Sequence, residues 1–355
     1  CFTVSENCRE LVIQFKQMKN RICVIFTGGT IGSYSNGGIV DLKPETSSLL
    51  IEKYRERFGN AIHFDELRPL NILSENMQPS DLEVMADCIR GVDKDAYDGI
   101  ILTHGTDTLC FTANLFSQLF CDIKIPLVFV YALYPLDDDR SRGVENFAGA
   151  VTFIESVDYG GVFVRFENRS ENCKIHLASR IISATQIRGE YDSILNVHYG
   201  EIRGGKFVYN DNDNNPAPSQ LRRPRKPCIA QKLCTDLVII QAHSLLNFDY
   251  YRFNEVKPKA VMVQLYHSGT VCTEGKEANF INFLAYCKNL GIEVVIATID
   301  SSARTYGSAV GLADLCTAAY DISFEMATVK VLLALGSGRN IADELQTNNF
   351  FEKLH

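Results

Sequence analysis

Short apolar runs alternate with amphipathic stretches along most of this chain, and that alternation constrains its fold more than any other feature. Ile22–Phe26, Gly99–Thr103 and Pro126–Tyr131 are continuous apolar runs, which are typical of strands buried on both faces of a parallel sheet. Between them, helical spacing of apolar residues predicts helices at about 46–58, 107–119 and 144–156, with another beginning near Pro79. The pattern predicts an α/β protein with helices on both faces of its sheet.

A polar segment divides this alternation into two parts. Residues 210–227 carry four of the ten prolines of the chain, and the cluster Arg222–Lys226 favours a solvated linker over a nucleic-acid patch. Further strands are expected after the linker, at 237–242, 260–265 and 293–299. We therefore expect a larger N-terminal domain at 20–209, with a mixed, largely parallel sheet, and a smaller parallel α/β domain at 228–355.

Composition excludes several classes of function. The 355 residues carry a net charge of −8, which argues against a polyanionic partner such as nucleic acid. No apolar run approaches the ~20 residues that span a bilayer. The twelve cysteines contain no C-x-x-C pair, so they predict neither a zinc ribbon nor a redox pair. Glu6, Arg9 and Glu10 interrupt any signal peptide, and we expect a cytoplasmic protein with reduced cysteines.

Two of the predicted strands end in turns rich in glycine and threonine. The first turn is Thr27–Thr30 and the second is Thr103–Thr108. Ligands of open α/β sheets bind beyond the carboxyl ends of the strands. Glycine allows a ligand to approach the backbone, and threonine supplies a hydroxyl. The first turn lacks both the G-x-G-x-x-G pattern and the P-loop lysine, so nucleotide binding is weakly indicated.

These motifs resemble those of a known family. TGGTIG at 27–32, SENM at 74–77, HGTDT at 104–108, YHSGT at 266–270 and FEMATVK at 324–330 are similar to landmarks of the L-asparaginases, particularly the cytoplasmic bacterial type. The resemblance runs from about Arg21 to the C-terminus. It implies the two-domain asparaginase-like fold and hydrolysis of the asparagine side-chain amide to aspartate and ammonia. It also implies no metal or cofactor, and a homodimer or homotetramer whose sites are completed between subunits.

The resemblance assigns roles to individual residues. Thr30 matches the nucleophile, and Thr106 and Asp107 match the second catalytic threonine and its neighbouring aspartate, which also binds the substrate α-ammonium. Ser74 matches the serine that contacts the substrate carboxylate. The other positions expected to line the substrate site are Gly29, Glu75, Gly105 and Ala132.

The chain departs from the family pattern at the expected base. Family members carry a lysine in a pattern like R-T-T-K, where this chain has Leu177–Arg180. Arginine has a pKa above ~12 and is no general base near neutrality, but we expect Arg180 to hold Asp107 in place. Lys174 is the other possible counterpart. Tyr131 replaces a glycine and Arg142 an aspartate near the expected site.

Three functions remain open from the sequence. The leading prediction is an amidohydrolase of the asparaginase type that acts on a small amino acid. The second is an asparaginase-like component of a tRNA-dependent amidotransferase, which frees ammonia for another subunit. The third is a catalytically weakened relative that binds an amino acid as a sensor or scaffold, which Tyr131, Arg142 and Arg180 favour.

Overall fold

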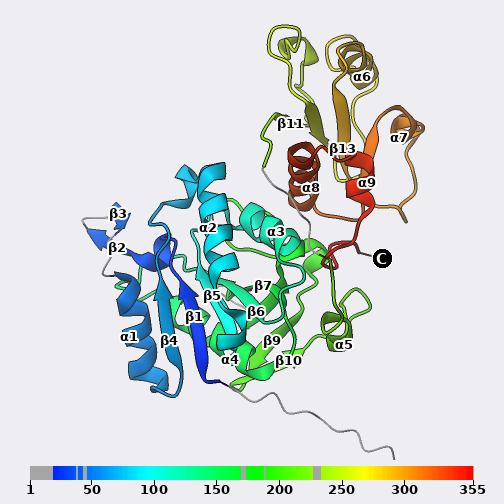
Figure 1. Ribbon diagram of the computed structural model, residues 1–355. Helices are drawn as coiled ribbons and strands as arrows, with labels where there is room; N and C mark the ends of the chain where they lie inside the picture. The colour runs from blue at the N-terminus through cyan, green and yellow to red at the C-terminus, as the bar shows by residue number, and fades with distance from the viewer. Residues whose placement is uncertain are drawn as a thin grey trace, which may run out of the picture.

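The larger part of the protein is built on one eight-stranded sheet (Figure 1). The computed structural model describes residues 19–36, 39–42, 46–168, 173–187, 189–226 and 233–354. The neighbouring strands, in order, are β10 (Lys206–Tyr209), β9 (Gly200–Arg203), β8 (Cys173–Leu177), β7 (Gly161–Phe166), β6 (Pro126–Val130), β5 (Gly99–Thr103), β1 (Arg21–Ile25) and β4 (His63–Leu67). The strands from β4 to β7 are parallel and β8, β9 and β10 are antiparallel, which confirms the mixed, largely parallel sheet.

Helices cover both faces of this sheet. The helices are α1 (Thr46–Phe58), α2 (Pro79–Gly91), α3 (Leu109–Leu119) and α4 (Gly143–Ser156). Helix α1 packs on α4, and α2 packs on α3. Strands β5, β6 and β7 are buried along their whole length, because a strand between two helical layers exposes neither face. A separate two-stranded hairpin, β2 (Ser33–Asn36) with β3 (Ile39–Leu42), follows the first turn.

A second, smaller sheet lies in the C-terminal part of the chain. It is parallel throughout, and its strands are β11 (Leu237–Gln241), β12 (Ala260–Gln264), β13 (Glu293–Ile299) and β14 (Thr317–Tyr320). Separate apolar clusters pack on its two faces, one containing α6 (Phe280–Asn289) and the other α8 (Phe324–Ser337) and α9 (Ile341–Gln346). We call residues 19–226 the large domain and 233–346 the small domain. The two-domain α/β fold expected from the sequence is confirmed.

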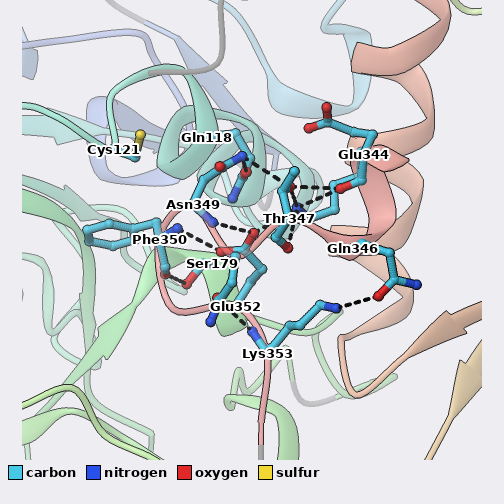
Figure 2. Close-up of polar contacts among 12 residues, drawn as sticks. Gln118, Cys121, Ser179, Glu344, Gln346, Thr347, Asn349, Phe350, Glu352 and Lys353 are labelled. Atoms are coloured by element: carbon cyan, nitrogen blue, oxygen red, sulfur yellow. Dashed lines mark hydrogen bonds and ion pairs between the residues drawn. The ribbon is translucent and has the colours of Figure 1, made fainter. Parts of the chain in front are cut away.

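After α9 the chain returns to the large domain (Figure 1). Residues 347–354, which we call the C-terminal strap, insert Phe350 into the core of the large domain, where it is fully buried. Figure 2 shows that Ser179 Oγ donates to the Phe350 carbonyl at 2.7 Å and that Asn349 Nδ2 donates to Gln118 Oε1 at 3.0 Å. The strap therefore fastens the small domain to the large one.

In the described residues up to 226, the segment expected to be a solvated linker is exposed along much of its length and is also anchored to the large domain. Helix α5 (Pro218–Leu221) places Leu221 in the core of the large domain. Arg222 forms an ion pair with Asp158, and Arg225 donates to the Cys121 carbonyl. Arg222 and Arg225 are therefore bound to the large domain, because carboxylates and carbonyls of that domain lie within their reach, whereas Arg223 and Lys226 are exposed. Residues 227–232 lie outside the described residues, as do residues 1–18 at the N-terminus.

Candidate active site

The two glycine and threonine turns meet at the carboxyl edge of β1 and β5. Thr27 Oγ1 donates to the Thr103 carbonyl at 2.6 Å, and Thr27 N–H donates to Thr103 Oγ1 at 3.3 Å. A Cβ added to Gly29 would lie 2.5 Å from Gly105 N, so the turns are in direct backbone contact. Only glycine allows this approach, because no side chain separates the two backbones.

A third segment packs against the second turn. Ser74 begins the short 3-10 helix Ser74–Asn76, and its side chain is almost fully buried against the second turn. Asp107 N–H donates to Ser74 Oγ at 3.2 Å, and Thr108 Oγ1 donates to the Ser74 carbonyl at 3.2 Å. A Cβ on Gly105 would clash with the Ser74 side chain. Motifs that lie far apart in the sequence are thus packed into one unit.

The reactive side chains of this unit lie at its surface. Thr30 and Thr106 are half-buried and Asp107 is exposed, whereas Gly29, Gly105 and Ala132 are buried. The neighbouring Glu75 is exposed. No hydrogen bond joins the Thr30 or Thr106 hydroxyl to another described residue. Both hydroxyls therefore remain available to a ligand at this edge.

Replacing Gly29 with alanine should disrupt the backbone contact between the two turns. Gly29 has φ +75° and ψ 179°, a region that only glycine adopts readily, and the added Cβ would meet the Gly105 backbone. We expect Gly29→Ala to lower the free energy of unfolding by about 2 kcal/mol or more. Gly59→Ala is the matched control, since Gly59 also has a positive φ (+88°) but no atom lies within 4 Å of the added Cβ. Equal losses in urea denaturation of the two variants would contradict the close packing of the turns.

His104 is a structural residue in this turn. Its ring is fully buried, its Nδ1 donates to the Gly105 carbonyl at 2.7 Å, and its Nε2 has no partner among the described residues. Burial lowers the pKa of His104 from its ordinary 6.5 to about 4, although the hydrogen bond to Gly105 opposes this shift. The imidazole is therefore neutral near pH 7 and serves to hold the turn.

This histidine predicts acid sensitivity. Between pH 6.5 and 4 the unfolded chain binds a proton at His104 that the folded protein does not. Stability should therefore be full above pH 6.5 and fall with pH, by up to about 1.4 kcal/mol per pH unit for this group. His104→Asn should flatten the dependence when urea midpoints are measured at pH 7, 6 and 5. Identical slopes for wild type and variant would contradict this assignment.

Tyr191 contacts the second turn, whereas Tyr131 lies in the core. Tyr131 is buried in the core, where its ring contacts Phe166 and Tyr191 at centroid distances of 5.7 and 5.4 Å. The residue that reaches the second turn is Tyr191, whose hydroxyl donates to the Thr106 carbonyl. Sequence reasoning missed Tyr191, because no motif marks it and its partner lies 85 residues away.

The expectation that Arg180 holds Asp107 is corrected by the contacts of its guanidinium. Arg180 Nε donates to the Phe351 carbonyl of the strap at 2.7 Å, and Nη1 donates to Asn215 Oδ1 at 3.4 Å. Burial lowers the pKa of Arg180 to about 10, against the opposing effect of the Glu352 carboxylate. The side chain turns toward the strap because carbonyl and carboxylate oxygens gather there.

Lys174 and Arg142 were also singled out from the sequence. Lys174 lies near His176, whose pKa is lowered by burial and by the positive charges of His198 and Lys174. Arg142 is exposed and pairs with Glu167 at 2.8 Å. Two further side chains lie beside the start of α3, which follows the second turn: Ser183 Oγ lies 3.7 Å from Cys110 Sγ, and Glu325 binds Ser183.

Two cavities of about 440 and 490 Å³ lie in the small domain, and neither is lined by the turns. No group of three or more His, Cys, Asp or Glu in the described part of the chain is arranged to hold a metal ion. Over the same residues, no helix is long and apolar enough to cross a bilayer.

Known proteins share parts of this sequence. A glutamyl-tRNA(Gln) amidotransferase component of Thermoplasma volcanium is 28% identical over 206 residues, which are 56% of this chain and 49% of that protein. An L-asparaginase of Thermococcus kodakarensis is 30% identical over 162 residues, which are 45% of this chain and 47% of that protein. The chain thus spans about half the length of these curated relatives in the matched regions.

Solved structures share the whole fold. The thermostable L-asparaginase from Thermococcus kodakarensis superposes with a TM-score of 0.75 at 22% identity, covering 94% of this chain and 99% of that one. A probable cytoplasmic L-asparaginase from Campylobacter jejuni gives a TM-score of 0.70 at 21% identity, with the same coverage. In addition, residues 21–213 match the family model described as asparaginase, N-terminal. Because this match spans more than half of the chain and includes both turns, the chain belongs to the asparaginase family.

Proposed function

We propose that this protein is an amidohydrolase that cleaves the side-chain amide of L-asparagine to L-aspartate and ammonia, with Thr30 as nucleophile. The observation that carries the proposal is the backbone contact between Gly29 and Gly105, which brings Thr30 and Thr106 to one edge of the sheet. Membership of the asparaginase family supports the reaction class.

The proposed reaction proceeds through an ester. Thr30 Oγ attacks the amide carbon, and the C–N bond breaks as ammonia leaves with the proton of the hydroxyl. Water then cleaves the ester, which restores the Thr30 hydroxyl and releases aspartate. Backbone N–H groups of the glycine-rich turns are suited to stabilise the oxyanion of each tetrahedral intermediate. The proposal uses neither a metal nor an organic cofactor.

Substrate binding is assigned to the groups around the second turn. The exposed carboxylate of Asp107 is suited to pair with the α-ammonium of the amino acid. Ser74 Oγ accepts from Asp107 N–H, so its own proton is available to the α-carboxylate. Arg180 has no part in this scheme, because its guanidinium binds the strap.

The assembly proposed from the family resemblance is a homodimer or homotetramer in the cytoplasm. The exposure of Asp107 and the partial exposure of Thr30 and Thr106 support it, because a second copy would exclude water from a substrate bound there. Light scattering after size-exclusion chromatography measures the subunit number. A monomer that hydrolyses asparagine at an ordinary rate would contradict completion of the site by a partner.

A second candidate function has support from the curated relatives. The amidotransferase component of Thermoplasma volcanium is similar over about half of this chain. In such a role, the same threonine chemistry would release ammonia from glutamine for a partner protein. This candidate predicts a preference for glutamine and stimulation by a partner.

Ammonia release by the purified protein tests the proposal. L-asparagine and L-glutamine are supplied separately at matched concentrations, and initial rates are measured with a coupled ammonia assay. Faster release from asparagine supports the asparaginase activity, and faster release from glutamine supports the second candidate. Saturable aspartate binding by calorimetry without ammonia release would overturn both and favour a sensor.

A further inference from the structure

A buried carboxylate of the small domain reaches the large domain beside the candidate site. Glu325 lies in the first turn of α8 and is 6% exposed. Its Oε1 accepts from Ser183 N–H at 2.7 Å and from Ser183 Oγ at 2.6 Å. Helix α8 packs along α3, which begins immediately after the second turn. Glu325 is thus bound across the junction of the two domains.

Ser183 belongs to a hairpin that contacts the second turn. An isolated bridge pairs Ile181 with Ser193, and Ile182 N–H donates to the Asp192 carbonyl at 3.1 Å. We call the described residues 181–187 and 189–193 the Ser183 hairpin. On its returning limb lies Tyr191, whose hydroxyl donates to the Thr106 carbonyl. The hairpin is therefore bound at one limb by Glu325 and at the other by the candidate catalytic turn.

Other contacts keep the hairpin on α3. Asn114 Nδ2 donates to the Ile181 carbonyl at 2.8 Å, and Cys110 Sγ lies 3.7 Å from Ser183 Oγ. Burial raises the pKa of the Tyr191 phenol, and the charges of Asp107 and Glu325 raise it further. The phenol is therefore protonated and able to donate to Thr106 near neutral pH.

We propose that Glu325 is a positioning residue of the active site, which acts through the Ser183 hairpin and Tyr191 on the placement of Thr106 and Asp107. The inference rests on the proposed function and deepens it, because it makes the small domain of the same chain a support of the catalytic turn. Glu325 touches no reacting atom in this arrangement. Its two hydrogen bonds to Ser183 are charge-assisted, which makes them stronger than neutral ones.

Replacement of Glu325 should affect turnover more than substrate affinity. A displacement of about 1 Å at reacting groups costs up to about 100-fold in rate, so we expect Glu325→Ala to lower kcat by about tenfold or more. Glu325→Gln keeps an acceptor for both donors of Ser183 and should retain kcat within about threefold. Tyr191→Phe should lower kcat in the same direction, and its effect should not add to that of Glu325→Ala.

The test combines steady-state kinetics with hydrogen exchange of the substrate-free protein. Glu344→Gln is the matched control, since Glu344 is also buried in the small domain but pairs with Arg339. We expect faster exchange in peptides of the Ser183 hairpin and of residues 104–108 in Glu325→Ala alone. If Glu325→Gln keeps both kcat and the rate of hydrogen exchange close to the wild-type values, positioning by hydrogen bonds is supported.

Three results would overturn the inference. One is unchanged exchange in the hairpin of Glu325→Ala, and another is a loss of kcat in Glu325→Gln as large as in Glu325→Ala. The third is additivity with Tyr191→Phe. The exchange measurement needs no substrate, so a wild-type protein without hydrolytic activity would refute the proposed function and still leave the link from Glu325 to Thr106 testable.

Discussion

Single replacement of Lys330 or Glu352 by alanine should lower the free energy of unfolding by about 3–5 kcal/mol, since each leaves a buried charge without its partner. Lys330 Nζ lies 2.7 Å from Glu352 Oε1, and both side chains are fully buried. The ammonium also donates to Thr347 Oγ1 at 2.6 Å, and Glu352 accepts from the backbone N–H of Asn349 and Phe350. The pair thus holds the strap on α8.

Chemical denaturation of matched variants measures this effect. Asp87→Ala is the control, because the ion pair of Asp87 with Arg90 has the same 2.7 Å separation but lies on the surface, where we expect a cost below about 1 kcal/mol. The double variant Lys330→Met with Glu352→Gln should be less destabilised than the two alanine variants summed, because no buried charge remains. Costs for Lys330→Ala and Glu352→Ala no larger than for Asp87→Ala would contradict this account of the strap.

Thr30→Ala should reduce ammonia release from asparagine by about 10³-fold or more, as loss of a covalent nucleophile does in other hydrolases. The methyl side chain removes the attacking oxygen but leaves Ser74 and Asp107 to bind the amino acid. We therefore expect kcat to fall while aspartate binding, measured by calorimetry, changes by less than about tenfold. Thr30→Ser is the matched control, because it keeps a hydroxyl and should retain measurable turnover.

The opposite pattern would contradict the role of Thr30. If Thr30→Ala retained turnover while Thr106→Ala lost it, the second turn would carry the nucleophile. If both retained turnover, the chemistry would lie away from the two turns. Thermal unfolding of each variant shows whether a loss of activity comes from a loss of the fold.

The strands that the sequence predicts best are those buried on both faces. Gly99–Thr103 has the expected bounds and Pro126–Val130 ends one residue before the expected end, because burial between two helical layers demands a continuous apolar run. His63–Leu67 was not predicted, since its sequence HFDEL carries two acidic residues. It is an edge strand paired only with β1 in its sheet, and an edge tolerates charged side chains.

The candidate site was predictable only where local sequence forms it. The turns with Thr30 and Thr106 follow strands directly, so motif and position predict their proximity. The strap and the Ser183 hairpin depend on contacts between distant residues: 171 residues separate Arg180 from Phe351, and 142 separate Ser183 from Glu325. No local pattern marks such contacts, and this is why Arg180 was assigned to Asp107 and the contact of Glu325 with Ser183 was not predicted.

The most direct measurement is to locate the ester that the mechanism requires. The enzyme is mixed with isotopically labelled L-asparagine, quenched in acid within milliseconds, digested and examined by mass spectrometry. The account predicts labelled aspartyl ester on the peptide that contains Thr30, and none in Thr30→Ala. Label on the peptide that contains Thr106, or undiminished ammonia release by Thr30→Ala, would contradict it.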